Sequence, residues 1–359
     1  MGIVSRETTL DPAPRSSTEV SRETMPEVEG IESGTSGVQD VEEMTSTDLP
    51  YLDSPIAREA ATAVHVQNIR QEQWPKPSSV RVLTVANQKG GVGKTTSTVN
   101  VATALAMHGL RVLVVDLDPQ GNASTALGVD HSVGTASIYD VLLGDMSLAD
   151  VVTEVAETPG LFSVPATIDL AGAELELASQ VAREYRLQRA LTAYLNEQPE
   201  IDYIFIDCPP SLGLLTLNAL VAAREVMIPI QCEYYALEGL AQLLATVEMV
   251  QSYLNPAVAV TTVLLTMYDS RTKLADQVAD EVRRHFGALT VNSVIPRNVR
   301  VSEAPGFGQT VMTYDPGSRG AVGYLQAARE IAGRAAEVIA GISTTPAASA
   351  TDKSERSDS

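Results

Sequence analysis

The sequence is poor in cysteine, in basic residues and in long apolar runs, and each shortage excludes a class of protein. Two cysteines in 359 residues, Cys208 and Cys232, cannot form a disulfide framework or a four-thiolate metal site within one chain. No apolar run reaches the roughly 18 residues of a membrane-spanning helix, and the first residues lack the apolar stretch of a signal peptide. We therefore expect a soluble protein of the reducing cytoplasm, with no membrane partner.

The charge balance limits the partners further. Lys and Arg number 25 against 45 Asp and Glu, which gives a net charge of −20. A basic coat for nucleic acid over the whole surface is excluded, so any contact with a polyanion needs a local basic patch. The length allows about two domains and is sufficient to bury a sizeable core.

Residues 1–79 differ in composition from the rest of the chain. They carry six basic residues against fourteen acidic ones, and few apolar residues fall at helical or strand spacing. Such a segment buries too little surface to offset its ordering entropy. We expect a disordered acidic N-terminal tail over 1–79, with one possible short helix at 55–71, and a second polar tail over 343–359. Tyr51 and Trp74 are interpreted as part of the solvated tail rather than as anchors for a partner.

Residues 80–342 alternate between short apolar runs and helical patterns. Nearly continuous apolar runs are typical of strands buried on both faces of a parallel sheet. The alternation predicts an α/β fold, a doubly wound and mostly parallel sheet with helices on both faces. The expected strands are Val80–Ala86, Val112–Asp116, Leu161–Val164, Tyr203–Asp207, Val226–Ile230, Val258–Leu265 and Val291–Ile295; the clearest helices are Thr95–Met107, Leu214–Ala223, Leu237–Tyr253, Lys273–Phe286 and Ala321–Ala340.

A glycine-rich turn joins the first expected strand to the first helix. It reads Asn87-Gln88-Lys89-Gly90-Gly91-Val92-Gly93-Lys94-Thr95-Thr96. In such a turn the backbone N–H groups and the helix N-terminus face phosphate oxygens. Lys94 would reach the β- and γ-phosphates, and the Thr95 hydroxyl would bind Mg²⁺. Gln88 stands where the strict motif has its first glycine, and Lys89 adds a second lysine. The alternative is a chance glycine turn.

Aspartates follow two other apolar strands. Asp116 and Asp118 come at the end of the second expected strand, and Asp207 ends the run Tyr203–Asp207. A carboxylate at the end of a buried strand is costly without a charged partner, and Mg²⁺ with its waters is such a partner. A single aspartate in this position is often structural, but three beside a phosphate loop favour a metal site.

Several of these motifs resemble those of a known family. Lys89-Gly90-Gly91-Val92-Gly93-Lys94-Thr95-Thr96 resembles the deviant Walker A motif of the ParA/MinD ATPases, a type of P-loop NTPase. Asp116-Leu117-Asp118-Pro119-Gln120-Gly121-Asn122 is similar to the second motif of the chromosome-partitioning branch, ParA/Soj. The stretches Pro229–Gly239 and Ile295–Pro305 are similar to the same branch. The resemblance covers residues 80–342 and neither tail.

The resemblance implies ATP and Mg²⁺ as cofactors and a role for each matching residue. Two ATP-bound protomers would form a face-to-face homodimer, in which Lys89 crosses to the partner's nucleotide. Asp118 would orient the attacking water, and Asp116 and Asp207 would hold Mg²⁺ through water. The other matching residues would contact the nucleotide: Gly90, Gly91, Val92, Gly93, Lys94 and Thr95 around the phosphates, Thr96 at the α-phosphate, and Pro296 and Asn298 at the adenine. For Pro296 and Asn298 a surface turn is the alternative.

The resemblance also implies non-specific binding of double-stranded DNA by the ATP dimer. Residues 266–320 carry seven basic residues against six acidic ones, a local reversal of the overall charge. Arg271 and Arg300 are the first candidates for phosphate contacts, followed by Arg297. The alternative is that all three are ordinary solvated charges. Contacts of this kind carry no sequence information.

Taken together, these features predict a DNA-partitioning ATPase of the cytoplasm, associated with the nucleoid. The resemblance implies a ParB-type centromere-binding partner that stimulates hydrolysis, and the acidic tail could bind a polar or septal scaffold. A MinD-like membrane-cycling regulator is the alternative, but residues 344–359 lack the apolar face of a membrane-binding helix. A carrier related to the nitrogenase iron protein would need cysteine ligands, commonly a C-x-x-C pair, and the sequence has no such pair. Residues 1–79 show no helix-turn-helix pattern, so sequence-specific repression is not expected.

Overall fold

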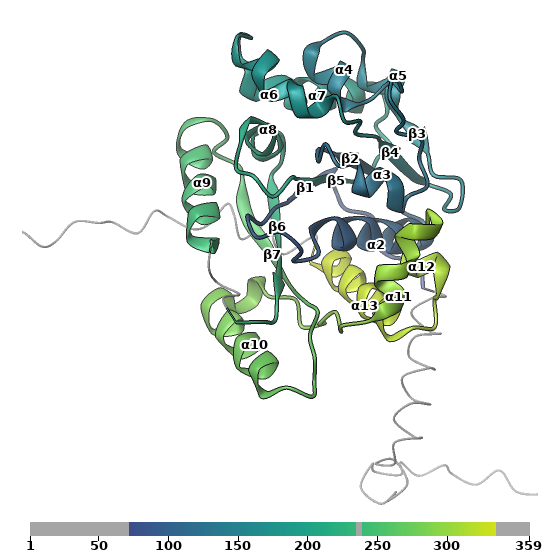
Figure 1. The fold of residues 1–359 in the computed structure, drawn as a ribbon, viewed down its shortest axis with the longest axis vertical. Coiled ribbons are helices and arrows are strands. Elements are labelled where there is room, and N and C mark those ends of the chain that lie inside the picture. The colour runs from purple at the N-terminus through teal and green to yellow at the C-terminus, as the bar shows by residue number, and fades with distance from the viewer. Residues whose placement is uncertain (1–71, 235–238, 335–359) are drawn as a thin grey trace, which may run out of the picture. The chain divides into compact units, whose positions relative to one another are not determined.

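The computed structural model describes residues 72–234 and 239–334, and within them seven strands form one sheet (Figure 1). The strand order is β3-β4-β2-β5-β1-β6-β7, and only the β3–β4 pair is antiparallel. The doubly wound, mostly parallel sheet expected from the sequence is confirmed. The strands are β1 (Arg81–Val85), β2 (Val112–Asp116), β3 (Thr153–Glu154), β4 (Leu161–Val164), β5 (Tyr203–Asp207), β6 (Glu225–Gln231) and β7 (Ala259–Thr266).

Helices cover both faces of this sheet, as the sequence predicted. One apolar cluster joins one face to α2, α3, α12 and α13, and a second joins the other face to α4 through α10. The central strands β1, β2 and β5 are buried along their whole length. The helices are α2 (Lys94–Met107), α3 (Asn122–Ala126), α4 (Ile138–Leu143), α5 (Leu148–Val151), α6 (Leu170–Ala178), α7 (Arg186–Glu197), α8 (Leu214–Ala222), α9 (Leu240–Tyr253), α10 (Lys273–Phe286), α11 (Val299–Glu303), α12 (Val311–Tyr314) and α13 (Arg319–Gly333).

Parts of the sequence predictions lie outside the described residues. These are the tail up to residue 71 with its possible helix at 55–71, and everything from residue 335 onward. The domain boundaries at 79/80 and 342/343 stay predictions. None of the helices among residues 72–234 and 239–334 is both long and apolar enough to cross a bilayer.

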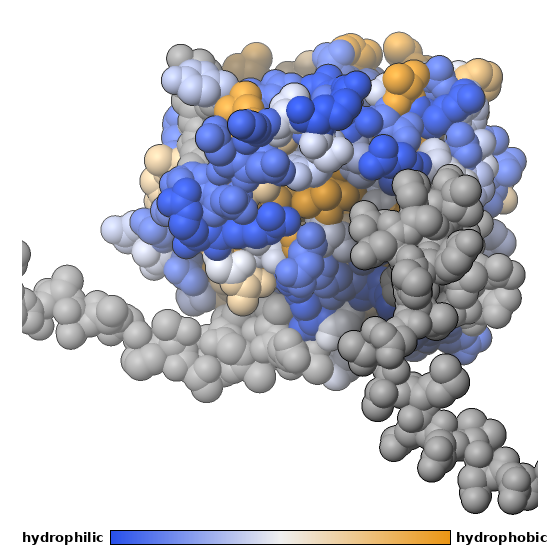
Figure 2. Space-filling model, turned by 90° about the horizontal axis from the view of Figure 1, so that it is seen from below, coloured by the Kyte–Doolittle hydropathy of each residue, from blue (hydrophilic) through white to orange (hydrophobic). Residues whose placement is uncertain are grey.

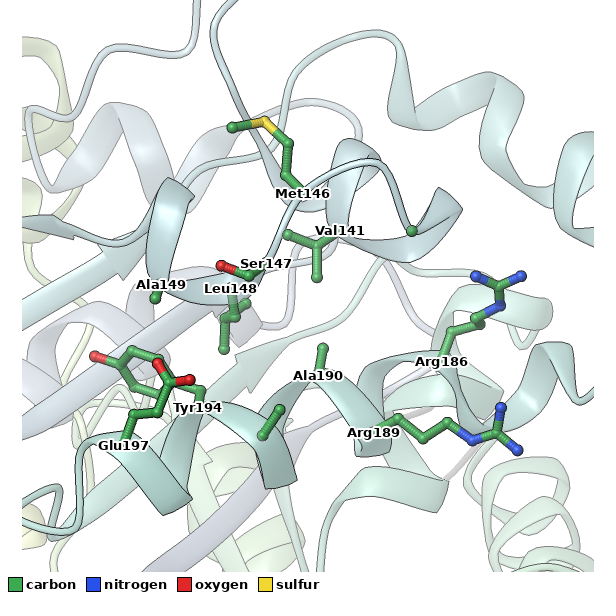
Figure 3. A pocket seen from close by; sticks show the side chains of 12 residues that line it. Val141, Met146, Ser147, Leu148, Ala149, Arg186, Arg189, Ala190, Tyr194 and Glu197 are labelled. Carbon is green, nitrogen blue, oxygen red and sulfur yellow. The ribbon is translucent and has the colours of Figure 1, made fainter.

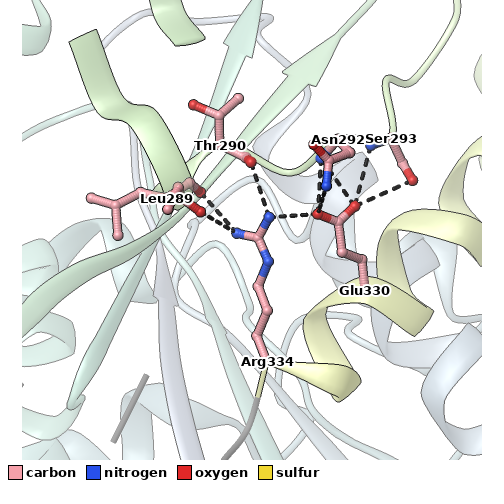
Figure 4. A network of polar contacts seen from close by, with 7 residues as sticks. Leu289, Thr290, Asn292, Ser293, Glu330 and Arg334 are labelled. Carbon is pink, nitrogen blue, oxygen red and sulfur yellow. Dashed lines mark hydrogen bonds and ion pairs between the residues drawn. The ribbon is translucent and has the colours of Figure 1, made fainter. Parts of the chain in front are cut away.

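One predicted strand is wrong. Val291–Ile295 is no strand, although the N–H groups of Val291 and Ile295 donate to β7 carbonyls at 2.9 and 2.8 Å. Between them, the N–H groups of Asn292 and Ser293 donate to the carboxylate of Glu330 in α13, at 2.9 to 3.2 Å (Figure 4). A side chain therefore takes the donors that a regular ladder would use. The two-residue edge strand β3 was not expected, because it is exposed and has no apolar pattern.

The Glu330 carboxylate belongs to a wider network that fixes the end of α13. Arg334 pairs with Glu330 and also donates to the carbonyls of Ala288, Leu289 and Thr290 at 2.9 to 3.2 Å (Figure 4). The network holds α13 against the connection that follows α10.

Trp74 is buried, so its interpretation as part of a solvated tail is wrong. Its side chain is 5% exposed and stacks on His108, with ring centroids 3.9 Å apart and planes within 9°. His108 caps the C-terminal end of α2, the helix that begins at the glycine-rich turn. Two ion pairs accompany this contact: Glu72 with Arg329, and Lys76 with Asp202. The burial of Trp74 depends on the ring of His108, which lies on another element. The composition of the residues around Trp74 gives no sign of this contact.

The Trp74 contact can be measured directly, because Trp74 is the only tryptophan in the chain. We expect native fluorescence at shorter wavelength than that of the urea-unfolded chain, because the indole is out of water. His108→Ala should shift the native emission to longer wavelength and lower the free energy of unfolding by about 1 kcal/mol, the value of a stacked aromatic pair. His285→Ala, at an exposed position of α10, is the matched control. A native emission equal to that of the unfolded chain would contradict the burial.

Candidate nucleotide-binding site

The glycine-rich turn connects β1 to α2 and faces open space. Gly91 and Gly93 have φ of +73° and +89°, a left-handed conformation that residues with a Cβ rarely adopt. A Cβ added at Gly90 or Gly91 would meet no atom within 4 Å. The turn is therefore a preshaped, open cradle in front of the helix N-terminus, which suits an anionic ligand.

Side chains from neighbouring strands hold this turn in place. Asn87 donates from Nδ2 to the carbonyl of Pro229 in β6 at 2.8 Å, and its Oδ1 accepts from Lys89 N at 3.0 Å. Thr266, the last residue of β7, donates its hydroxyl to the carbonyl of Val92 at 2.8 Å. The cradle is thus fixed at two points before any ligand binds, which lowers the ordering cost of binding.

Lys94 is buried at the start of α2, with 7% of its surface exposed. Its Nζ lies 3.5 Å from the carbonyl of Lys89, a long hydrogen bond that leaves most of its donor capacity unused. Burial lowers the pKa of Lys94, and the nearby charges of Asp207 and Asp118 oppose that shift. Lys89, Thr95 and Thr96 are half-buried at the same turn. The structure brings together the predicted phosphate-binding residues.

Asp116 and Asp207 lie directly opposite each other on β2 and β5, and both are fully buried. Asp116 accepts hydrogen bonds from Asp118 N at 3.1 Å and from the N–H and hydroxyl of Ser124 at 2.9 and 2.8 Å. Asp207 accepts at Oδ1 from the Thr98 hydroxyl at 3.1 Å, but its Oδ2 is buried without a partner. Burial above all, together with the charge of the opposing carboxylate, raises the pKa of Asp207.

This carboxylate pair fits a magnesium ion. The unpartnered Asp207 oxygen and the two opposing carboxylates suit a cation, and oxygen ligands are those that Mg²⁺ prefers. Within the described ranges no cluster of three or more His, Cys, Asp or Glu could hold a metal. A metal at this edge would therefore take its remaining ligands from hydroxyls such as Thr95, from water and from phosphate, as Mg²⁺ at nucleotide sites commonly does.

Asp118 begins a tight turn next to this pair. Its carbonyl accepts from Gly121 N at 2.9 Å, and its Oδ1 accepts from Gln120 N at 3.0 Å. The Asp118 side chain is buried, and it follows the carboxyl end of β2 just as the glycine-rich turn follows the carboxyl end of β1. This geometry suits a carboxylate that orients a small polar group in the site.

Pro296 and Asn298 lie on a segment beside the end of β7. Ile295 N donates to Leu265 O at 2.8 Å, and Tyr268 N donates to Ile295 O at 2.9 Å. The segment therefore runs close to Thr266, which holds the glycine-rich turn. Asn298 uses its Oδ1 to cap α11, accepting from Arg300 N at 2.8 Å. An adenine contact at these residues stays a prediction.

The three arginines predicted to bind DNA are exposed, but each pairs with a carboxylate of the same chain. The exposed fractions of Arg271, Arg297 and Arg300 are 84%, 56% and 54%. Arg271 binds Asp269 with two nitrogens, at 2.8 and 2.7 Å, Arg297 pairs with Glu233, and Arg300 pairs with both Glu303 and Asp315. The positive charge of these arginines is therefore partly neutralised.

The surface near α10 shows the same pairing. The face seen in Figure 2, from below in Figure 1, is largely hydrophilic in its described part. On α10, Arg283 pairs with Asp280 and Arg284 with Glu281. The positive charge of these two α10 arginines is thus partly neutralised by carboxylates of the same helix.

A separate pocket of about 300 Å³ lies between α7 and the α4–α5 connection (Figure 3). Its floor is apolar, with Val141, Leu148 and Ala190, and Arg186 and Arg189 lie at one end with Glu197 at the other. It contains none of the residues that the sequence predicted for a site, so the nucleotide cradle is distinct from it.

Sequence reasoning missed several residues that support the site. Thr98 lies four residues after Lys94, on the same helix face, so helical spacing could have indicated it. Asn87 was quoted with the turn but given no role. Ser124 reaches Asp116 from α3 and Thr266 reaches Val92 from β7, and no local signal in the sequence marks either contact.

Comparisons with known proteins agree with this geometry. The model of a family described as an AAA domain matches residues 80–260. A chromosome partitioning protein ParA of Caulobacter vibrioides is 51% identical over 255 residues, which cover 71% of this chain and 95% of that protein. The sporulation initiation inhibitor protein Soj of Bacillus subtilis is 52% identical over 252 residues, which cover 70% of this chain and 98% of that protein.

A solved structure shares both fold and sequence. Cobyrinic acid a,c-diamide synthase from Mycobacterium smegmatis, with bound ADP and magnesium, is 40% identical with a TM-score of 0.60. The match covers 71% of this chain and 93% of that one, and a structure of the same protein holds an ATP analog and magnesium. The similarity thus extends over nearly the whole length of these relatives.

Proposed function

This chain belongs to the ParA/Soj family of chromosome-partitioning ATPases, and we propose that it binds and hydrolyses ATP with Mg²⁺ to drive the segregation of DNA. The observation that carries the proposal is the open glycine-rich cradle beside Lys94 and the buried Asp116–Asp207 pair with its unsatisfied oxygen. Relatives that hold ADP or an ATP analog with magnesium support the same cofactors.

Each residue of the cradle has a defined task. The backbone of Gly90 to Gly93, with Lys94, binds the β- and γ-phosphates, and Thr96 contacts the α-phosphate. Thr95, Asp116 and Asp207 hold Mg²⁺, which neutralises phosphate charge when bound. Asp118 orients the attacking water, and Pro296 and Asn298 line the adenine. Lys94 supplies a buried positive charge where negative charge develops on the transferred phosphoryl group.

Lys89 acts on the nucleotide of a second protomer. Its N–H is tied to Asn87, so the backbone is fixed while the side chain stays half-buried at the rim of the cradle. In a face-to-face ATP dimer this lysine crosses the interface and stabilises phosphate charge in trans, as an arginine finger does in other NTPases. Dimer formation is thereby coupled to ATP.

The ATP dimer binds double-stranded DNA without sequence preference, through Arg271, Arg300 and Arg297. Since each arginine already pairs with a carboxylate, DNA phosphates must displace those partners, and a single protomer binds weakly. Two weak surfaces joined in one dimer bind far more tightly than either alone, which makes DNA binding depend on ATP. A ParB-type protein stimulates hydrolysis and thereby releases the DNA. Through its DNA contacts, this chain associates with the nucleoid. The acidic N-terminal tail binds a polar or septal scaffold.

We expect DNA binding only in the ATP state. The experiment measures binding to non-specific duplex DNA at one fixed salt concentration with no nucleotide, with ADP, with ATP, and with ATP and Lys89→Ala. Salt is fixed because phosphate contacts are strongly salt-dependent. Binding with ATP alone, lost in Lys89→Ala, supports the proposal. Equal binding in all four conditions contradicts the dimer gate, and no binding in any of them contradicts DNA as the partner.

A further inference from the structure

The orientation of Asp118 depends on the far end of its turn. Gly121 closes the turn by donating its N–H to the Asp118 carbonyl at 2.9 Å, and Gln120 N holds the Asp118 carboxylate at 3.0 Å. Both donors belong to the backbone of the same turn. Any displacement of Gly121 is therefore passed to the carboxylate.

His131 closes over Gly121 from a later segment of the chain. A Cβ built on Gly121 would lie 2.4 Å from His131 Cδ2 and 3.0 Å from the carbonyl of Ala166, so the imidazole edge rests directly on the glycine. Thr125 donates its hydroxyl to the Gly121 carbonyl at 3.0 Å. The Thr125 hydroxyl oxygen also lies 2.8 Å from His131 Nε2. In the tautomer that satisfies both contacts, the Thr125 hydroxyl donates to Gly121 and His131 Nε2 donates to Thr125.

The segment that presents His131 is itself fixed. Asp130 accepts hydrogen bonds from the N–H and hydroxyl of Ser132 at 3.1 and 2.8 Å. The chain then enters α4, where Ile138 N donates to Pro165 O at 2.9 Å, just after β4. The backbone on either side of His131 is thus held by contacts outside the turn, while the imidazole itself contacts Gly121 and Thr125.

We propose that His131, acting through Thr125 and Gly121, is a positioning residue that holds the Asp118 carboxylate in its working orientation. The proposal rests on the proposed function, in which Asp118 orients the attacking water. His131 contacts the outer side of the turn and takes no part in binding the phosphates. Its contribution is to kcat, since a misplaced carboxylate loses alignment with the water while the phosphate cradle is unchanged.

The test compares ATP hydrolysis by the full chain carrying His131→Ala, His131→Gln, Thr125→Val or the double change His131→Ala/Thr125→Val. We expect His131→Ala to lower kcat about tenfold and Thr125→Val to do the same. KM and the equilibrium affinity for ATP, measured by dialysis, should stay within about twofold of the wild type. His131→Gln should recover most of the rate, because its amide can donate to Thr125. The double change should cost no more than either single one, since both break one contact.

His285→Ala, an exposed histidine on α10, is the matched control. A kcat for His131→Ala equal to that of the control overturns the inference, as does an equal loss in His131→Gln accompanied by a lower melting temperature. Asp118→Ala separates the two proposals. Hydrolysis that Asp118→Ala abolishes but His131→Ala leaves intact overturns only this inference, whereas a wild-type chain without ATPase activity overturns both.

Discussion

Replacing Lys94 with alanine will lower the rate of ATP hydrolysis by about a hundredfold to a thousandfold, the usual effect of removing one preorganised charge at a reacting oxyanion. Lys94 is buried, and the hydrogen bond from its ammonium group to the carbonyl of Lys89 is long at 3.5 Å. Its ammonium group is therefore held out of water and remains available for a phosphate. The measurement is phosphate release under single-turnover conditions, together with the equilibrium affinity for ATP.

Lys76→Ala is the control for this result. Lys76 is an exposed lysine that pairs with Asp202 at 3.3 Å. Asp202 precedes the N-terminal end of β5, whereas the cradle follows the carboxyl end of β1. The Lys76→Ala variant should hydrolyse ATP at the wild-type rate. Hydrolysis by Lys94→Ala at more than about a tenth of the wild-type rate would mean that the phosphates bind elsewhere, because one lost charge at this site costs far more.

Replacing Arg81 with methionine will lower the free energy of unfolding by about 3–5 kcal/mol, because it leaves a buried carboxylate without its partner. Arg81 in β1 binds Glu225 in β6 with two nitrogens, each at 2.7 Å, and both side chains are buried. Arg81 also donates to the carbonyl of Ile331 at 2.7 Å, which ties the sheet to α13. Without it, the remaining hydrogen bond to the Glu225 carboxylate from the described residues comes from the Thr261 hydroxyl, at 2.8 Å.

Urea unfolding of three proteins separates the pair from its packing. The wild type, Arg81→Met and the double variant Arg81→Met/Glu225→Met form the series. We expect the double variant to be more stable than the single one, because a hydrophobic pair of similar volume removes the isolated charge. A single variant that loses less than about 1 kcal/mol would show that water reaches Glu225 and that the pair is not truly buried.

The glycine-rich turn and the helix that follows it could be predicted from the sequence because their signals are local. A positive φ at Gly91 and Gly93 requires glycine, and the lysine and threonines follow directly in the first helical turn. The central strands could be predicted equally well, since β1, β2 and β5 are nearly continuous apolar runs buried on both faces. Steric and hydrophobic rules act over a few residues, so a short window contains them.

The errors arose where distant residues compete for the same groups. Val291–Ile295 has the apolar content of a strand, but Glu330 takes the N–H groups of Asn292 and Ser293. Trp74 stands in an acidic segment, and its burial depends on His108, a partner on another element. The pairing of Arg297 with Glu233 is likewise visible only in the folded chain, and DNA contact by the three candidate arginines stays a prediction.

The sequence by itself determined the class of the fold, the phosphate cradle and the aspartates at the strand ends, because backbone sterics and hydrophobic runs are written in neighbouring residues. Only the tertiary structure decided that Asp116 faces Asp207, that Thr266 holds Val92 and that His131 rests on Gly121. Those contacts depend on strand register and on loop paths over many residues. Hydrogen-bond partners so far apart leave no spacing in the chain that could predict them.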